Sequence, residues 1–97
     1  MSDDSYQQQR QEGAKLIIQK ANQLAQNDNL KIDKIEWNHG QPIIDRANHV
    51  LSITANGKTV KDEFPDEWLA DYSGRVGTEK ANAVLSGIIH QLRQGVA

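Results

Sequence analysis

The chain has no cysteine, only two prolines and few aromatic residues, which make up 5% of its 97 residues. The absence of cysteine excludes disulfide bonds, thiolate metal sites, thiol redox chemistry and a cysteine nucleophile. The longest apolar runs, such as Leu16-Ile17-Ile18, contain three residues, whereas a membrane-spanning helix needs about 20. The sequence therefore predicts a protein that is stabilised by packing and does not cross a membrane.

An excess of basic residues is also lacking. Eleven Lys and Arg residues against thirteen Asp and Glu residues give a net charge of −2, so that nucleic acid is not the expected partner. Residues 1–5 are acidic and polar and are not followed by an apolar run, which argues against a signal peptide and favours a cytoplasmic location. The polar stretch from Gln7 to Gln11 is expected to fray or to form an exposed helical turn.

Two amphipathic helices are expected near the ends of one domain. Residues 1–5 are expected to form a disordered tail, and residues 6–97 suffice for a single α+β domain with one core. Apolar residues recur at three- and four-residue spacing over about 6–25 and again from Thr78, the expected N-cap, to near Gly95. The two stripes consist of Ala14, Ile17, Ile18, Ala21, Leu24 and Ala25, and of Ala81, Val84, Leu85, Ile88, Ile89 and Leu92.

A β-hairpin is the clearest local signal. The pair Asn56-Gly57 separates two β-prone runs, 50–55 and 58–64. Such a pair favours a two-residue type I′ turn, because both turn residues need a positive φ. The turn and the apolar alternation predict the same register. In that register Ala55 faces Lys58, Ile53 faces Val60, Leu51 faces Asp62 and His49 faces Phe64.

Shorter elements are expected on both sides of the hairpin. The apolar alternation in residues 30–38 breaks once, so a strand either begins near Asp33 or contains a bulge there. His39-Gly40-Gln41-Pro42 predicts a turn. Ile43-Ile44 predicts an extended segment whose pairing partner the sequence does not decide. Pro65 predicts the start of a short helix that ends at Tyr72-Ser73-Gly74. The fold class is therefore α+β: a three-stranded antiparallel sheet flanked by N- and C-terminal helices, in the order α-β-β-β-α, with a short extra helix before the last.

No motif for catalysis, metal binding or nucleotide binding is present. His39, His49 and His90 lack the spacing of a helical metal motif, and the serines and glycines match neither a nucleophile elbow nor a phosphate-binding loop. Clustered carboxylates favour a solvated helix cap over acid–base catalysis. The protein is expected to be no enzyme and to need no metal or organic cofactor. The carboxylates are Asp62, Glu63, Asp66, Glu67 and Asp71.

The order helix, three strands, helix resembles the double-stranded RNA-binding domain over roughly residues 6–94. His39-Gly40-Gln41-Pro42 lies where that family carries a glycine-proline loop with a groove-contacting histidine, although the residue order differs. Residues 78–82 lie where the family has a lysine-rich helix start, and there Lys80 and Ala81 match. The resemblance implies an RNA-binding domain as the alternative function. Its implied phosphate contacts are Lys80, Arg75, His39, Lys58 and Lys61.

The leading hypothesis is a small non-enzymatic protein-interaction module. Residues 64–72 combine aromatic anchors with an acidic field that steers a basic partner, and the strand before them offers backbone groups if it lies at a sheet edge. The partner is an unknown protein, with a basic chain and a second copy of this chain as candidates. Reversing the charges of Asp66 and Glu67 is expected to leave folding intact. The expected partner-binding residues are Phe64, Asp66, Glu67, Trp68, Asp71 and Tyr72.

Overall fold

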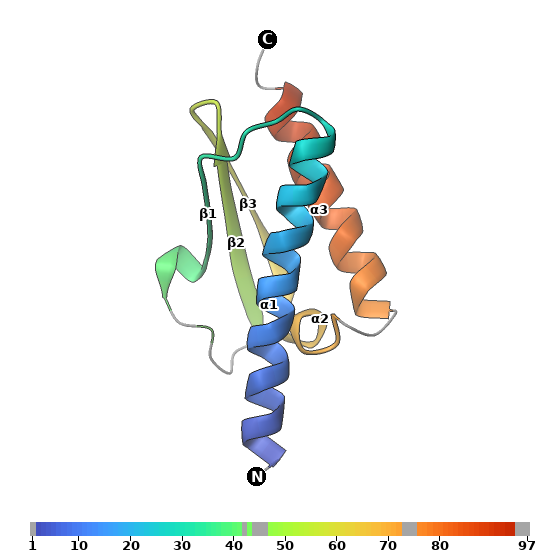
Figure 1. The fold of residues 1–97 in the computed structure, drawn as a ribbon. Helices are drawn as coiled ribbons and strands as arrows, with labels where there is room; N and C mark the ends of the chain where they lie inside the picture. Colours follow the sequence, from blue (N-terminus) through green and yellow to red (C-terminus); the bar gives the residue numbers. More distant parts are fainter. Residues whose placement is uncertain (1, 42, 44–46, 73–75, 95–97) are drawn as a thin grey trace.

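A computed structural model describes residues 2–41, 43, 47–72 and 76–94, in which two long helices lie on one face of a three-stranded antiparallel sheet (Figure 1). The α+β class and the predicted order of elements are confirmed. The elements are α1 (Ser2–Asn27), β1 (Lys34–Trp37), the 3-10 turn η1 (Asn38–Gly40), β2 (Asn48–Ala55), β3 (Lys58–Pro65), α2 (Asp66–Ala70) and α3 (Val76–Gln94).

The two apolar stripes form the helical side of the core. Every residue of both stripes is buried except Ile18, Leu24 and Val84, which are half-buried against it. Helix α1 begins at Ser2 rather than near residue 6. The stretch 7–11 is part of this helix, since glutamine and arginine are good helix formers. Helix α3 begins at Val76, so the expectation that Thr78 is the N-cap is wrong. The Thr78 hydroxyl instead donates a hydrogen bond to the Tyr72 carbonyl.

The hairpin has the predicted register. Strands β2 and β3 pair Ala55 with Lys58, and the ladder continues in step to His49 and Phe64. Asn56 and Gly57 at the turn have φ angles of 55° and 76°, the left-handed values that a type I′ turn requires. The prediction is confirmed because turn geometry and side-chain alternation act on the same few residues.

The register also decides which backbone groups face the open edges. A two-residue turn makes Ala55 and Lys58 a hydrogen-bonded pair. Because hydrogen-bonded and non-hydrogen-bonded pairs alternate along an antiparallel ladder, the backbone N–H and C=O groups of Ala55, Ile53, Leu51 and His49 in β2 point towards β3. The intervening residues face β1, and the Asp33 amide accordingly donates to the Thr54 carbonyl at 2.8 Å. Strand β1 begins at Lys34, the first of the two predicted alternatives. On β1, the backbone groups of Ile35 and Trp37 therefore point away from the sheet.

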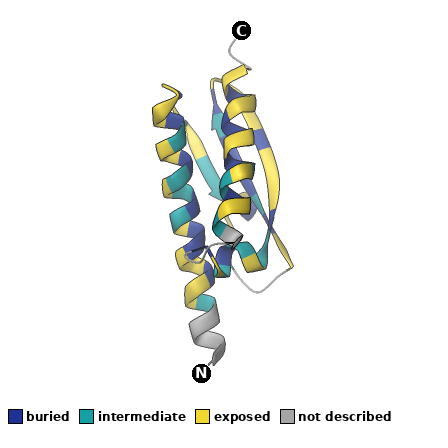
Figure 2. Ribbon diagram, turned by 90° about the vertical axis from the view of Figure 1, so that its right-hand side faces the viewer, coloured by how far each residue is buried: buried dark blue, intermediate teal, exposed yellow. Residues whose placement is uncertain are grey.

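Aromatic rings join the sheet to the helices. Trp37 packs edge-on against Phe64 with ring centroids 5.3 Å apart, and Phe64 packs in the same way against Trp68 at 5.9 Å. The Trp37 indole N–H donates to the carbonyl of Ala14 in α1 at 3.2 Å. Buried residues accordingly line the sides of the helices and the sheet that face each other (Figure 2). These contacts hold β1 under α1.

The shortest helix approaches α1 closely. A side-chain carbon added at Gly13 would collide with the backbone carbonyl of Leu69 in α2. Gly13 therefore lets the two backbones meet. Ile43 lies half-buried outside any strand, while Pro42, Ile44 and residues 73–75 of the expected turn, extended segment and helix stop fall outside the described residues.

Candidate functional site

A buried polar network joins α1, β2, α2 and η1. Its centre is Asp66, the first residue of α2, whose carboxylate accepts two hydrogen bonds from Arg10 in α1, from Nε at 2.6 Å and from Nη2 at 3.0 Å. Arg10 is only 4% exposed and also donates through Nη1 to Gln7. Gln7 in turn donates to the carbonyl of Ile43 at 2.7 Å. The bidentate ion pair thus attaches the first turns of α1 to the rest of the fold.

His49 extends this network on the other side of Asp66. Its ring is fully buried, with Nε2 at 2.6 Å from Asp66 Oδ1 and Nδ1 at 3.1 Å from Asn38 Nδ2. The Asn38 Oδ1 accepts the amide hydrogen of Val50 at 2.9 Å. Since a backbone amide only donates, the Asn38 amide must direct its NH₂ group at His49. His49 therefore holds its proton on Nε2 and donates it to Asp66.

The environment of Asp66 favours its charged form. Burial raises the pKa of its carboxyl group, but the hydrogen bonds and positive charge of Arg10, together with the contact to His49, outweigh burial and lower the pKa below the ordinary 3.8. Asp66 is therefore an ionised acceptor at neutral pH. The expectation that Asp66 belongs to a solvated cap is wrong, because its partners bury its side chain to 14% exposure.

The backbone beside this network has an unusual conformation. Asn38, His39 and Gly40 have successive φ angles of 50°, 59° and 88°, in the left-handed region that costs a non-glycine residue about 1–2 kcal/mol. The side-chain bonds of Asn38 to Val50 and His49 offset this cost. The turn predicted for residues 39–42 is present one residue earlier, at residues 38–41, where the Gln41 amide donates to the Asn38 carbonyl.

The network is suited to support rather than to chemistry. His49 is fully buried, and both of its ring nitrogens are engaged by neighbouring side chains. A general base needs to reach a substrate proton, which this ring does not do in the folded state. Among the residues that the structure describes, no three His, Asp or Glu side chains come together as a metal site would require.

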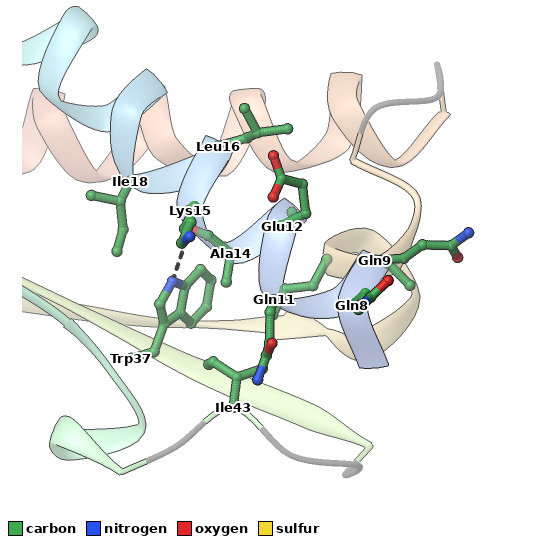
Figure 3. A pocket seen from close by; sticks show the side chains of 13 residues that line it. Gln8, Gln9, Gln11, Glu12, Ala14, Lys15, Leu16, Ile18, Trp37 and Ile43 are labelled. Carbon is green, nitrogen blue, oxygen red and sulfur yellow. Dashed lines mark hydrogen bonds between the residues drawn. The ribbon is translucent and has the colours of Figure 1, made fainter. Parts of the chain in front are cut away.

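A hollow of about 780 Å³ lies beside α1 and reaches the edge strand β1 (Figure 3). Trp37 and Ile43 lie on one side of it, and Gln11, Ala14 and Ile18 project from α1 towards them. Apolar surface and amide groups are therefore accessible next to backbone groups of β1 that point away from the sheet. Pockets that bind ligands usually combine such features. The other lining residues are Gln8, Gln9, Glu12, Gly13, Lys15, Leu16, Leu69 and Ala70.

The structure separates the expected partner-binding residues into three groups. Phe64 is fully buried, and Tyr72 is 7% exposed with its hydroxyl donating to Asn82. Neither side chain presents a surface to a partner in the folded protein. Burial raises the pKa of the Tyr72 phenol, an effect that the Asn82 contact opposes. Half-buried Trp68 and exposed Glu67 and Asp71 are the accessible members, and Asp66 belongs to the buried network.

Sequence reasoning missed the network itself. Gln7 and Arg10 stand in the stretch that was expected to fray, yet both make long-range hydrogen bonds. The one available signal was a single arginine among glutamines, which is ambiguous. Leu16, which is not part of the main apolar stripe of the first helix, is half-buried against the core.

The fold and its sites define an α+β domain with an open sheet edge, a hollow beside that edge and a buried ionic network. No protein-family model matches the sequence, and neither a curated protein nor a solved structure matches it. Within the described residues, no helix has the length and apolar character needed to cross a membrane.

Proposed function

We propose that the protein is a non-enzymatic module that binds an extended segment of a protein chain along the edge of β1. The observation that carries this proposal is the position of β1, an edge strand next to the hollow beside α1. An extended segment added to an edge forms main-chain hydrogen bonds, and its alternate side chains enter neighbouring pockets. The outward backbone groups of Ile35 and Trp37 supply the first component, and the hollow supplies the second.

The opposite edge of the sheet is less suited to strand addition. The alternation of the ladder makes Thr59, Lys61 and Glu63 the outward-facing residues of β3, and all three side chains are exposed. Charged side chains along an edge strand oppose pairing with another chain. On β1 the outward-facing residues are instead the half-buried Ile35 and the buried Trp37. Strand β1 also carries the charged Lys34 and Glu36, so the preference for β1 rests on the apolar side chains of Ile35 and Trp37 and on the hollow beside this edge.

The accessible part of α2 is a second contact within the same proposal. Glu67 and Asp71 are exposed and Trp68 is half-buried. Two carboxylates next to a partly exposed indole match a basic partner segment, since opposite charges increase the rate of encounter and aromatic residues dominate binding energy. A partner that binds β1 and continues towards α2 would therefore carry Lys or Arg in that part.

The RNA-binding alternative is less well supported by the geometry. Lys58 reaches the carbonyl of Gln91 near the end of α3, while Lys80 lies near the start of the same helix. Eleven residues of helix correspond to about 16 Å, so these two cations do not converge on one point. Glu79 is exposed next to Lys80, and Arg75 lies outside the described residues.

The proposal is tested by panning a phage-displayed library of unstructured peptides against the folded protein. Selected peptides are expected to shift the amide resonances of Ile35, Trp37 and Ile18 in titrations followed by NMR. The informative variant is Ile35→Pro, because proline removes the outward-facing N–H of Ile35 and leaves in place the N–H groups of β1 that pair with β2. Binding is expected to be lost in this variant.

Lys61→Pro is the matched control, since it removes an outward-facing N–H from β3. Peptide binding is expected to persist in this variant, and circular dichroism should show both variants folded. Selected peptides that bind Ile35→Pro as well as the unmodified protein would contradict the proposal. Resonance shifts confined to β3 would contradict it as well.

A further inference from the structure

We infer that the chain which pairs with β1 is a second copy of this protein, joined to the first by a two-fold axis through Ile35. This inference rests on the proposed function and names its partner. Around such an axis β1 runs antiparallel to β1 of the partner copy, and the two sheets become one six-stranded sheet. Ile35 has outward-facing backbone groups, so the two Ile35 residues form the central hydrogen-bonded pair.

The charges of β1 select this register. Lys34 and Glu36 flank Ile35 on the face of the sheet away from the helices, where Lys34 Nζ lies 3.6 Å from a Glu36 carboxylate oxygen. In an antiparallel pair centred on Ile35, Lys34 of each copy faces Glu36 of the other. Opposite charges in facing positions stabilise a cross-strand pair. If the register moved by one residue in each chain, Glu36 of one copy would face Glu36 of the other copy, and these like charges would destabilise the pair.

Helix α1 provides the second part of the interface. A two-fold axis perpendicular to the sheet keeps the helices of both copies on the same face, one α1 on each side of the axis. Trp37 contacts Ala14, and α1 and β1 run in opposite directions (Figure 1). Two strand residues span about 7 Å and four helical residues about 6 Å, so half-buried Ile18 lies near the level of Ile35.

The surface near Ile18 suits self-association. Ile18 and Gln11, on the side of α1 that faces the hollow, are uncharged, and the charged residues of α1 that line the hollow are Lys15 and Glu12. Two copies of this helix can approach each other with one positive and one negative charge from each. Each α1 would then cover the hollow of the other copy, and the partly exposed apolar surface of Ile18, Ile35 and Ile43 would be removed from water.

The experiment is a charge exchange followed by analytical ultracentrifugation over a concentration series. The unmodified protein is expected to dimerise. In a dimer of Lys34→Glu, glutamate faces glutamate at both symmetry-related positions, and in a dimer of Glu36→Lys, lysine faces lysine at both. Each variant is therefore expected to weaken the dimer about tenfold. The double variant Lys34→Glu with Glu36→Lys restores complementary pairs and should dimerise like the unmodified protein.

Mixing the two single variants provides a result that a general effect of charge does not produce. Lys34→Glu carries two glutamates and Glu36→Lys two lysines on β1, so both cross-strand pairs are complementary in the mixed dimer. A heterodimer tighter than either homodimer supports the inference. The control variant, Lys61→Glu with Glu63→Lys, exchanges charges on β3 and should leave the dimer unchanged.

Two outcomes would overturn the inference. The first is an unmodified protein that stays monomeric at all concentrations. If such a monomer still bound library peptides along β1, the proposed function would stand with a different partner. The second is a dimer that persists in Ile35→Pro, since an interface without the outward-facing N–H of Ile35 lies elsewhere on the molecule.

Discussion

His49 in β2 and Asp66 at the start of α2 are joined by a hydrogen bond of 2.6 Å, and the same Asp66 oxygen accepts a bond from Arg10. One carboxylate therefore connects three elements that are far apart in the sequence. Because burial leaves these groups little water, the network stabilises the fold only while all its members are present.

The first prediction concerns the charge of Asp66. Asp66→Asn removes a negative charge that pairs with the buried Arg10 guanidinium, and removing one member of a buried ion pair costs about 3 kcal/mol. We expect a loss of that size in the free energy of unfolding measured with urea. Asp71→Asn removes an exposed carboxylate of the same segment and should change stability by less than about 0.5 kcal/mol.

The second prediction concerns pH. The pKa of Asp66 is lower in the folded protein than the ordinary 3.8, so the unfolded chain binds this proton more readily. The stabilisation is complete well above pH 3.8 and is lost as the pH falls through the lower, folded pKa. The difference in the free energy of unfolding between the unmodified protein and Asp66→Asn should therefore become smaller as the pH falls below 3.8. A gap that widened in acid would contradict the lowered pKa.

The third prediction separates the two roles of Asn38. Asn38→Gly removes the hydrogen bonds to Val50 and His49 without backbone strain, and we expect a loss of about 2 kcal/mol, since buried polar groups lose their partners. Asn38→Ala adds the left-handed backbone cost and should lose about 1 kcal/mol more. Urea unfolding of both variants measures the difference. Equal stability of the two would show that the backbone conformation is not strained.

The fourth prediction concerns the proton of His49. Nitrogen-15 NMR of the imidazole should show hydrogen on Nε2 and none on Nδ1 at neutral pH, because the Asn38 amide donates to Nδ1. In Asn38→Gly this constraint is removed and the Nδ1–H form should become detectable. A folded protein with hydrogen on Nδ1 would require the opposite orientation of the Asn38 amide, and with it an unpaired Val50 amide.

The fifth prediction compares two helical glycines. Gly13→Ala forces a side-chain carbon against the Leu69 backbone, so the protein should be destabilised although alanine favours helix. Gly87→Ala in α3 meets nothing within 4 Å, and we expect it to stabilise the protein by about 0.5–1 kcal/mol. Thermal unfolding of both variants is sufficient. A stabilised Gly13→Ala would show that α1 and α2 can separate without loss.

The agreement between the expected and the observed elements shows which parts of the structure could be predicted from the sequence. The hairpin register depends on Asn56, Gly57 and their immediate neighbours, so a local pattern contains the necessary information. The helical stripes were equally clear because burial imposes a period on nearby residues. Both predictions describe contacts within or between adjacent elements.

The network and the hollow could not be predicted in this way. Arg10 and Asp66 are 56 residues apart, and each alone fits a solvated surface position. Their meeting depends on the path of α2 across α1, which Gly13 allows at close range. The edge position of β1 depends likewise on the order of strands in space. Local composition therefore leads to an expected site on residues 64–72, whereas the site proposed from the structure lies on β1.

The long separation of Arg10 and Asp66 also has a consequence for synthesis of the protein. Helix α1 leaves the ribosome before Asp66, so its Arg10 side chain cannot bind Asp66 until another 56 residues have followed. At 5–20 residues per second, this interval is about 3–11 s. The strands of the sheet are synthesised during this interval, but α3 follows Asp66 in the chain, so the apolar stripe of α1 lacks the cover of α3 until after it. A nascent-chain chaperone that recognises amphipathic helices would meet this segment before the native fold protects it.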